Sequence, residues 1–126
     1  MKKIIQTPHA PAPIGPYSQA VLAGNTLYVS GQIAIDPSSG NMVTVNIDRE
    51  ANQVMHNLKA VLEAAGMNFS NVIKTTIFLK DMNDFANVNE VYGQYFTDNF
   101  PARETVQVSR LPKDGNVEIS VVAVKD

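Results

Sequence analysis

Apolar side chains recur at helical spacing in two segments of the chain. In the first segment they lie on one stripe, at steps of three or one: Ala51, Val54, Met55, Leu58, Val61, Leu62 and Ala65. Asp48 is available as an N-cap and Gly66 as a stop, so the pattern predicts an amphipathic helix. A second apolar stripe consists of Phe85, Val88, Tyr92, Tyr95 and Phe96. It predicts another helix, from about Asp84 to Thr97.

Five other segments have the apolar and β-branched composition of strands. They cover residues 18–23, 26–35, 72–79, 103–111 and 117–124. Gly24-Asn25 suits a tight hairpin turn between the first two, and residues 36–41 carry the turn residues of a loop. Residues 1–16 include four prolines within nine positions, so we expect an irregular arm, with ordered structure starting near Tyr17. The predicted order is ββαβαββ.

This order implies an α+β fold in which two helices cover one face of a five- or six-stranded mixed sheet. In the last strand the odd positions are all apolar and are expected to face the helices: Val117, Ile119, Val121 and Ala123. The even positions are Glu118, Ser120, Val122 and Val124, and no third helix remains to cover them. Because that face is half apolar, it predicts self-association, with a solvated face as the alternative.

Composition narrows the class of protein. The 126 residues include 10 Lys and Arg against 12 Asp and Glu, a net charge of −2, and fit one domain over residues 1–126. This mildly acidic balance argues against binding to nucleic acid, which needs a basic face. Prolines interrupt the uncharged stretch from Ile4 to Ile35, so we expect no membrane segment and a cytoplasmic location. With no cysteine, disulfides and thiolate chemistry are excluded.

Few residues are suited to catalysis. The chain has no nucleophile elbow, phosphate loop or dinucleotide fingerprint, and neither His9 nor His56 has a partner at metal-ligand spacing. Arg103 and Glu118 remain, each on a predicted strand. A guanidinium can clamp a carboxylate through two parallel hydrogen bonds, and the backbone at Gly31 can approach a small ligand because no Cβ intervenes. Taken singly, an arginine or a glutamate on a strand is more often a solvated surface residue.

Strand alternation predicts the face that each of these residues takes. Arg103 and Thr105 would share the uncovered face with Glu118, while Val106 would point to the core. If the last two strands form a hairpin around residues 112–116, Arg103 and Glu118 lie roughly 23 Å apart. A small substrate cannot contact both at that distance, so two subunits would have to supply them to one site.

Six motifs occur in the order and spacing of a known family. They are Ile14-Gly15-Pro16-Tyr17-Ser18-Gln19-Ala20, Ser30-Gly31-Gln32, Asn83-Asp84-Phe85 with Val88-Asn89, Pro101-Ala102-Arg103, Arg110-Leu111-Pro112-Lys113-Asp114 and Val117-Glu118-Ile119. Over essentially its whole length the chain resembles the Rid family of reactive intermediate/imine deaminases, also called the YjgF family. The resemblance implies a fold similar to the Bacillus-type chorismate mutase, a homotrimer with a central barrel, helices outside and three sites in the subunit clefts.

The resemblance also implies an activity. It is hydrolysis of 2-aminoacrylate, 2-iminobutyrate and related enamines or imines to a 2-keto acid and ammonia, with no metal or organic cofactor. In the implied site Arg103 grips the substrate carboxylate, and Glu118 activates water and supports proton transfer to the leaving nitrogen. Tyr17 would close the pocket. Its wall and polar contacts would come from Ser30, Gly31, Asn89 and Thr105.

Glu104 departs from the family pattern, in which a small residue usually follows Pro-Ala-Arg. A carboxylate beside the clamp would weaken binding of an anionic substrate, unless strand alternation turns it to the opposite side. Two other functions stay open. One is a non-catalytic trimer that senses a 2-keto acid or an amino acid and regulates a partner. The other is endoribonuclease activity, proposed for some relatives, although this chain has no basic stripe and no paired histidines.

Overall fold

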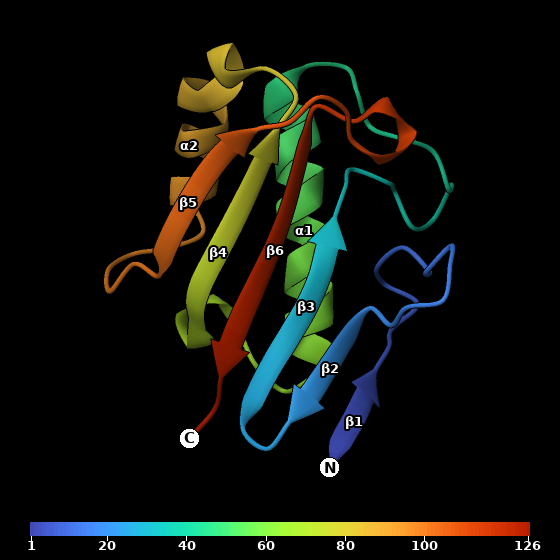
Figure 1. Cartoon of the computed structure of the whole chain (residues 1–126), viewed down its shortest axis with the longest axis vertical. Helices are drawn as coiled ribbons and strands as arrows, with labels where there is room; N and C mark the ends of the chain where they lie inside the picture. The colour runs from blue at the N-terminus through green and yellow to red at the C-terminus, as the bar shows by residue number, and fades with distance from the viewer.

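The computed structural model describes all 126 residues and contains one six-stranded sheet with two helices on one of its faces (Figure 1). The strands are β1 (Lys2–Ile5), β2 (Ala20–Ala23), β3 (Thr26–Gln32), β4 (Val72–Leu79), β5 (Ala102–Gln107) and β6 (Val117–Val124). The helices are α1 (Ile47–Ala64) and α2 (Phe85–Gly93), with short 3-10 turns at Phe69–Asn71, Met82–Asp84 and Pro112–Asp114. The predicted α+β fold, with a mixed sheet and two helices on one face, is confirmed.

β6, the last strand of the chain, lies in the middle of the sheet, whose order is β1-β2-β3-β6-β4-β5. It pairs antiparallel with β3 on one side and with β4 on the other, while β5 is parallel to β4 at the sheet edge. The hairpin expected around residues 112–116 is therefore wrong. After β5 the chain crosses the end of β4 and makes a 3-10 turn before β6 begins (Figure 1).

β1 is a strand that the sequence pattern did not predict. Residues Lys2–Ile5 pair antiparallel with β2 at the sheet edge opposite β5. Only Ile5 of these residues is buried, so the segment has no apolar alternation by which to recognise it. The expectation of an irregular arm is wrong for residues 2–5 and holds for residues 6–16, and the observed order is βββαβαββ.

The C-terminal stop of α1 at Gly66 is confirmed, whereas two other helix ends differ from the predicted ones for local reasons. The N-cap of α1 is Asn46 rather than Asp48, because the Asn46 side chain accepts a hydrogen bond from the Arg49 N–H at 2.8 Å. At the other end Gly66 has a φ of +73°, the left-handed conformation that stops the helix. α2 ends at Gly93, earlier than the spacing of its aromatic residues predicts. Tyr95 lies beyond the end of the helix but still packs against the core, so its apolar spacing does not show where the helix ends.

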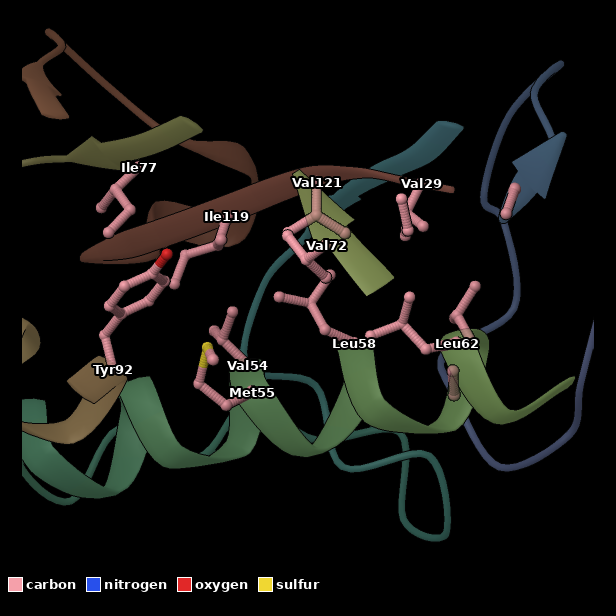
Figure 2. Close-up of a cluster of buried hydrophobic side chains, with 14 of the residues drawn as sticks. Val29, Val54, Met55, Leu58, Leu62, Val72, Ile77, Tyr92, Ile119 and Val121 are labelled. Carbon is pink, nitrogen blue, oxygen red and sulfur yellow. The ribbon is translucent and has the colours of Figure 1, made fainter. Parts of the chain in front are cut away.

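The hydrophobic core lies between the sheet and α1 (Figure 2). Val54 and Leu58 of α1 point toward Ile119 and Val121 of β6, whereas Leu62 points toward Val29 of β3. All six side chains belong to residues that are at most 5% exposed. Removing each such side chain from water contributes about 1.5–3 kcal/mol. The odd positions of β6 therefore form the floor for the helices, as the alternation predicted.

The opposite face of the sheet carries no helix (Figure 1). Tyr28 of β3 and Val106 of β5 are 54% and 42% exposed, and Ser120 and Val122 of β6 are only half-buried. We call this the open face. Neither helix is long and apolar enough to cross a membrane.

Candidate functional site

Arg103 faces the helices, not the open face. Its register partner on β4 is Thr75, which is fully buried beneath α2, and paired residues on neighbouring strands point to the same side. Thr105 follows two residues later on that side, whereas Val106 points to the open face. The prediction that Arg103 and Thr105 face the uncovered side of the sheet and Val106 faces the core is thus wrong. It is an edge strand with little apolar content, so alternation gives no decisive signal.

Three side chains of α2 hold the Arg103 guanidinium. Its Nη1 donates a hydrogen bond of 2.7 Å to Asn89 Oδ1, and its Cζ lies 5.0 Å from the Tyr92 ring centroid and 5.7 Å from that of Phe85. The Tyr92 hydroxyl donates to Thr75 Oγ1 at 3.0 Å, which fixes the ring. A cation over aromatic faces is attracted by about 0.5–1 kcal/mol at an exposed site. The guanidinium is therefore preorganised.

A cavity of about 280 Å³ opens beside this group, lined by Asn89, Tyr92, Gly93, Phe100, Pro101 and Arg103. Thr105 lies on the same side of β5, and its Oγ1 is buried without a hydrogen-bond partner. A buried hydroxyl in this state is uncommon and has a donor to offer. We call Arg103, Asn89, Tyr92 and Thr105 the Arg103 half-site. It can bind a small anion such as a carboxylate.

Glu118 lies in a second cavity, of about 340 Å³. The cavity is lined by Pro11, Ala12, Ile14, Tyr17, Gln19, Ser30, Gly31, Gln32, Ile33, Ile35, Pro112 and Glu118. Burial raises the pKa of Glu118 above its usual value of 4.5. We call Glu118, Gly31, Ser30 and Tyr17 the Glu118 half-site. A half-buried carboxylate with a raised pKa can exchange protons with a ligand in this cavity.

Gly31 gives the Glu118 side chain its space. A Cβ added at residue 31 would lie 2.0 Å from Glu118 Oε2 and 2.8 Å from its Cδ. The close approach arises from a bulge in β3, where three steps from Val29 to Gln32 oppose only two steps of β6. The absence of a Cβ at residue 31 thus leaves room for the Glu118 carboxylate. The sequence had suggested a different role for this glycine, in which its backbone approaches a ligand closely.

Ser30 and Tyr17 contribute unequally to this half-site. The Ser30 hydroxyl donates a hydrogen bond of 2.6 Å to the Ser18 carbonyl, so it holds the cavity wall together. Tyr17 is 51% exposed and lines the same cavity, where its side chain can contact a ligand. Each sequence-predicted site residue therefore lies in one of the two half-sites.

The two half-sites lie on opposite faces of the sheet. Glu118 pairs with Phe78 of β4 on the open face, while Arg103 pairs with Thr75 and faces the helices. Two strand spacings and a three-residue offset place their Cα atoms about 14 Å apart. The 23 Å expected from a hairpin and the shared face are both wrong. One chain alone still cannot bring the two charged groups to one small ligand.

Glu104 does not oppose Arg103. It points to the open face, where its Oε1 lies 3.0 Å from Lys74 Nζ and its Oε2 accepts a hydrogen bond of 2.6 Å from Thr76. These hydrogen bonds hold the pKa of Glu104 below its usual value. Strand alternation thus separates this carboxylate from the guanidinium, as the sequence allowed.

The sequence pattern does not indicate that Phe85, Tyr92 and Gln19 contribute to the candidate site. The helical spacing of Phe85 and Tyr92 predicts two core residues, although Phe85 is 37% exposed. Together with Asn89 they stand at i, i+4 and i+7 on one face of α2, a spacing that would have suited a binding face. Gln19 stands inside a family motif, but nothing local indicates what its amide binds.

Comparison with known proteins identifies the family. The family model described as Endoribonuclease L-PSP matches residues 7–125. The chain is 56% identical over 126 residues to the RutC family protein PH0854 of Pyrococcus horikoshii, and both are covered completely. It is 52% identical to the human 2-iminobutanoate/2-iminopropanoate deaminase, over 99% of this chain and 91% of the human protein. The structure of E. coli TdcF with bound serine matches with a TM-score of 0.94 and 43% identity, covering 98% of this chain and 99% of TdcF. The chain therefore belongs to the Rid family, also called the YjgF or L-PSP family.

Proposed function

We propose that the protein hydrolyses enamines and imines such as 2-aminoacrylate and 2-iminobutyrate to a 2-keto acid and ammonia. One observation carries the proposal: Arg103 and Glu118 both line cavities, and neither takes part in either ion pair of the chain. An unpaired guanidinium and an unpaired, partly buried carboxylate suit an anionic substrate that must gain and lose protons. The naming of relatives about half identical as 2-iminobutanoate/2-iminopropanoate deaminases supports this activity.

Arg103 binds the carboxylate of the substrate. A guanidinium has five N–H donors, and only one bond, to Asn89, is made within the chain. The remaining donors can form two parallel hydrogen bonds with a carboxylate. The Tyr92 ring beneath the guanidinium limits its rotation, so substrate binding loses less side-chain freedom.

Glu118 acts on the carbon–nitrogen bond. An enamine such as 2-aminoacrylate first takes a proton from water on its terminal carbon and so becomes the protonated imine. The ionised Glu118 then accepts a proton from water as the water oxygen bonds to the carbon of the protonated imine, whose nitrogen becomes a neutral amino group. Glu118 next gives this proton to the amino group. The carbon–nitrogen bond breaks, ammonia leaves, and the carbonyl forms as the hydroxyl proton passes to the ionised Glu118 and from there to water. A raised pKa makes the acid form of Glu118 available closer to neutral pH.

The site we propose is shared between neighbouring subunits of a homotrimer. Two features support it: the half-sites lie on opposite faces of one chain, and the open face exposes Tyr28 and Val106. Light scattering should give three times the chain mass of 13.7 kDa. A monomer at working concentration would contradict the trimer.

The activity is tested by adding the purified protein to a threonine dehydratase reaction. Faster formation of 2-ketobutyrate is expected, because the dehydratase releases 2-iminobutyrate. Arg103→Ala should abolish the effect, while the matched control Arg49→Ala, on an exposed position of α1 outside both half-sites, should keep it. No acceleration by the unmodified protein would refute the proposal.

A second candidate function is binding of an amino acid or 2-keto acid without turnover. The bound serine in the structure of E. coli TdcF favours it as an alternative. Calorimetry beside the kinetic assay separates the two functions. A pure binding protein would show Arg103-dependent heat of binding with serine or 2-ketobutyrate and would leave the dehydratase reaction unchanged.

A further inference from the structure

The segment between β1 and β2, residues 7–16, has almost no backbone hydrogen bonds of its own. Pro8, Pro11, Pro13 and Pro16 have no N–H to donate. No residue of the segment makes a backbone–backbone hydrogen bond beyond the turn in which the Tyr17 N–H donates to the Gly15 carbonyl. Nothing in the backbone therefore fixes this segment against the sheet.

One side chain supplies the missing bonds. The amide of Gln19 is buried, with the residue 2% exposed, and every atom of it that can form a hydrogen bond is used. Its Oε1 accepts from the Thr7 N–H at 2.7 Å, and its Nε2 donates to the carbonyls of Thr7, Ala10 and Pro11 at 3.1, 3.3 and 2.9 Å. No other side chain or backbone group outside the segment forms a hydrogen bond with it. Gln19 is thus its single polar tether.

The tethered segment forms one wall of the Glu118 cavity. Pro11, Ala12 and Ile14 line that cavity from the segment, and Ile33 and Ile35 line it from the chain after β3. All five are apolar, and Ile14 is 70% exposed although it lines the cavity. The cavity therefore offers an apolar surface beside the carboxylate, and three of the five residues that form it belong to the segment held by Gln19.

We propose that Gln19 is a positioning residue that sets the selectivity of the site among imino acids by the length of their aliphatic side chain. This rests on the proposed function: with the substrate carboxylate at Arg103 and its C=N carbon at Glu118, its remaining group contacts the apolar wall. Each additional methylene buried there strengthens binding about fourfold, equivalent to about 0.8 kcal/mol. The protein should accordingly prefer 2-iminobutyrate to 2-iminopropionate in kcat/KM by about fourfold.

The test compares Gln19→Leu with the matched control Gln6→Leu. Gln6 is exposed, precedes the same segment and forms no side-chain hydrogen bond, so its loss leaves the tether intact. The imino acids are generated in the assay from threonine and serine by dehydratases, and kcat/KM is measured for each. Gln19→Leu should reduce the preference for the longer substrate to about twofold or less, because the part of the wall formed by the segment is no longer fixed while Ile33 and Ile35 remain. Gln6→Leu should keep it.

A second measurement follows the tether itself. In the parent protein the Thr7 amide hydrogen is protected from exchange by Gln19 Oε1. Gln19→Leu should exchange this hydrogen at least tenfold faster while amides of β3 and β6 stay protected. If Gln19→Leu does not fold, Gln19→Glu takes its place and is read by substrate preference alone, since an ionised carboxylate still accepts from Thr7 but cannot donate to the three carbonyls.

Two results would overturn the inference. One is an unchanged preference, which includes an equal fold-loss of kcat/KM for both substrates, and the other is an unchanged Thr7 exchange rate in Gln19→Leu. The proposed function fails separately, if the parent protein turns over neither substrate. In that case the selectivity is read from calorimetry, as the ratio of affinities for 2-ketobutyrate and pyruvate. A ratio near one in the parent protein then refutes the apolar wall.

Discussion

The contact between Gly31 and Glu118 leads to a prediction with a large effect on activity and a small one on stability. In Gly31→Ala the new Cβ would lie 2.0 Å from Glu118 Oε2, where ordinary contact begins at 3.4 Å. The carboxylate must therefore retreat by more than 1 Å. A misplacement of about 1 Å in a catalytic group can reduce the rate about 100-fold, equivalent to about 2.7 kcal/mol of transition-state stabilisation.

Stability should change less, because the displaced atoms belong mainly to the far end of a flexible side chain. We expect kcat/KM in the dehydratase-coupled assay to fall about 100-fold in Gly31→Ala. Its urea midpoint should shift far less than it would for a buried core truncation. Comparing the loss of kcat/KM with the shift of the urea midpoint separates the effect of moving the carboxylate from any effect on folding stability.

A double-mutant cycle decides whether Gly31 acts through Glu118. Glu118→Ala removes the atoms with which the new Cβ clashes, so adding Gly31→Ala to it should lower kcat/KM and stability no further. Full activity in Gly31→Ala would refute the reasoning. So would a second, independent loss in the double variant, since Gly31 would then serve the ligand and not the carboxylate.

Three further predictions concern the half-sites. When the two single variants Arg103→Ala and Glu118→Gln are unfolded, mixed equally and refolded together, about a quarter of the parent activity should return. Each site in the ring takes its arginine from one subunit and its glutamate from the next, so random mixing gives an intact pair at about a quarter of the sites. No recovery would mean that one chain holds the whole site. Phe85→Leu removes the more exposed ring beside Arg103 and should raise KM about two- to fivefold with kcat unchanged, and a fall in kcat alone would contradict it. Because burial raises the pKa of Glu118, folding favours its neutral form, and the resulting contribution to the free energy of unfolding is present below pH 4.5 and lost as pH rises through the raised pKa. In urea unfolding Glu118→Gln should therefore be more stable than the parent protein at pH 7, and this advantage should vanish at pH 4. A Glu118→Gln variant less stable than the parent at pH 7 would refute the prediction.

The sequence predicted best those elements with the densest apolar and β-branched composition. β4 and β6 were expected at residues 72–79 and 117–124 and occupy those residues, since burial alternates along β6 and along the second half of β4. α1 was likewise recognised from its apolar stripe. β1 could not be predicted, because it is a short edge strand held by backbone pairing to β2 and buries only Ile5.

The candidate site was predicted in its residues but not in its geometry. Arg103 and Glu118 were chosen by charge, position and family motif. Their faces depend on which strands are neighbours, and consecutive strands pair often enough to make a hairpin the natural expectation. The insertion of β4 between β5 and β6 is a long-range arrangement that no local pattern of the last strands reveals. The hydrogen bonds from Gln19 to residues 7–11 are likewise not revealed by any local pattern around Gln19.

The placement of the two charged residues on opposite faces has a chemical consequence. A guanidinium and a carboxylate within reach of each other on one face can form an ion pair and neutralise each other. Instead, Arg103 and Glu118 lie on opposite faces, and each lacks a partner of opposite charge within its own chain. The remaining nearby carboxylate, Glu104, is held by Lys74 on the open face. This placement leaves the cation free for an anionic ligand and the carboxylate free to exchange a proton.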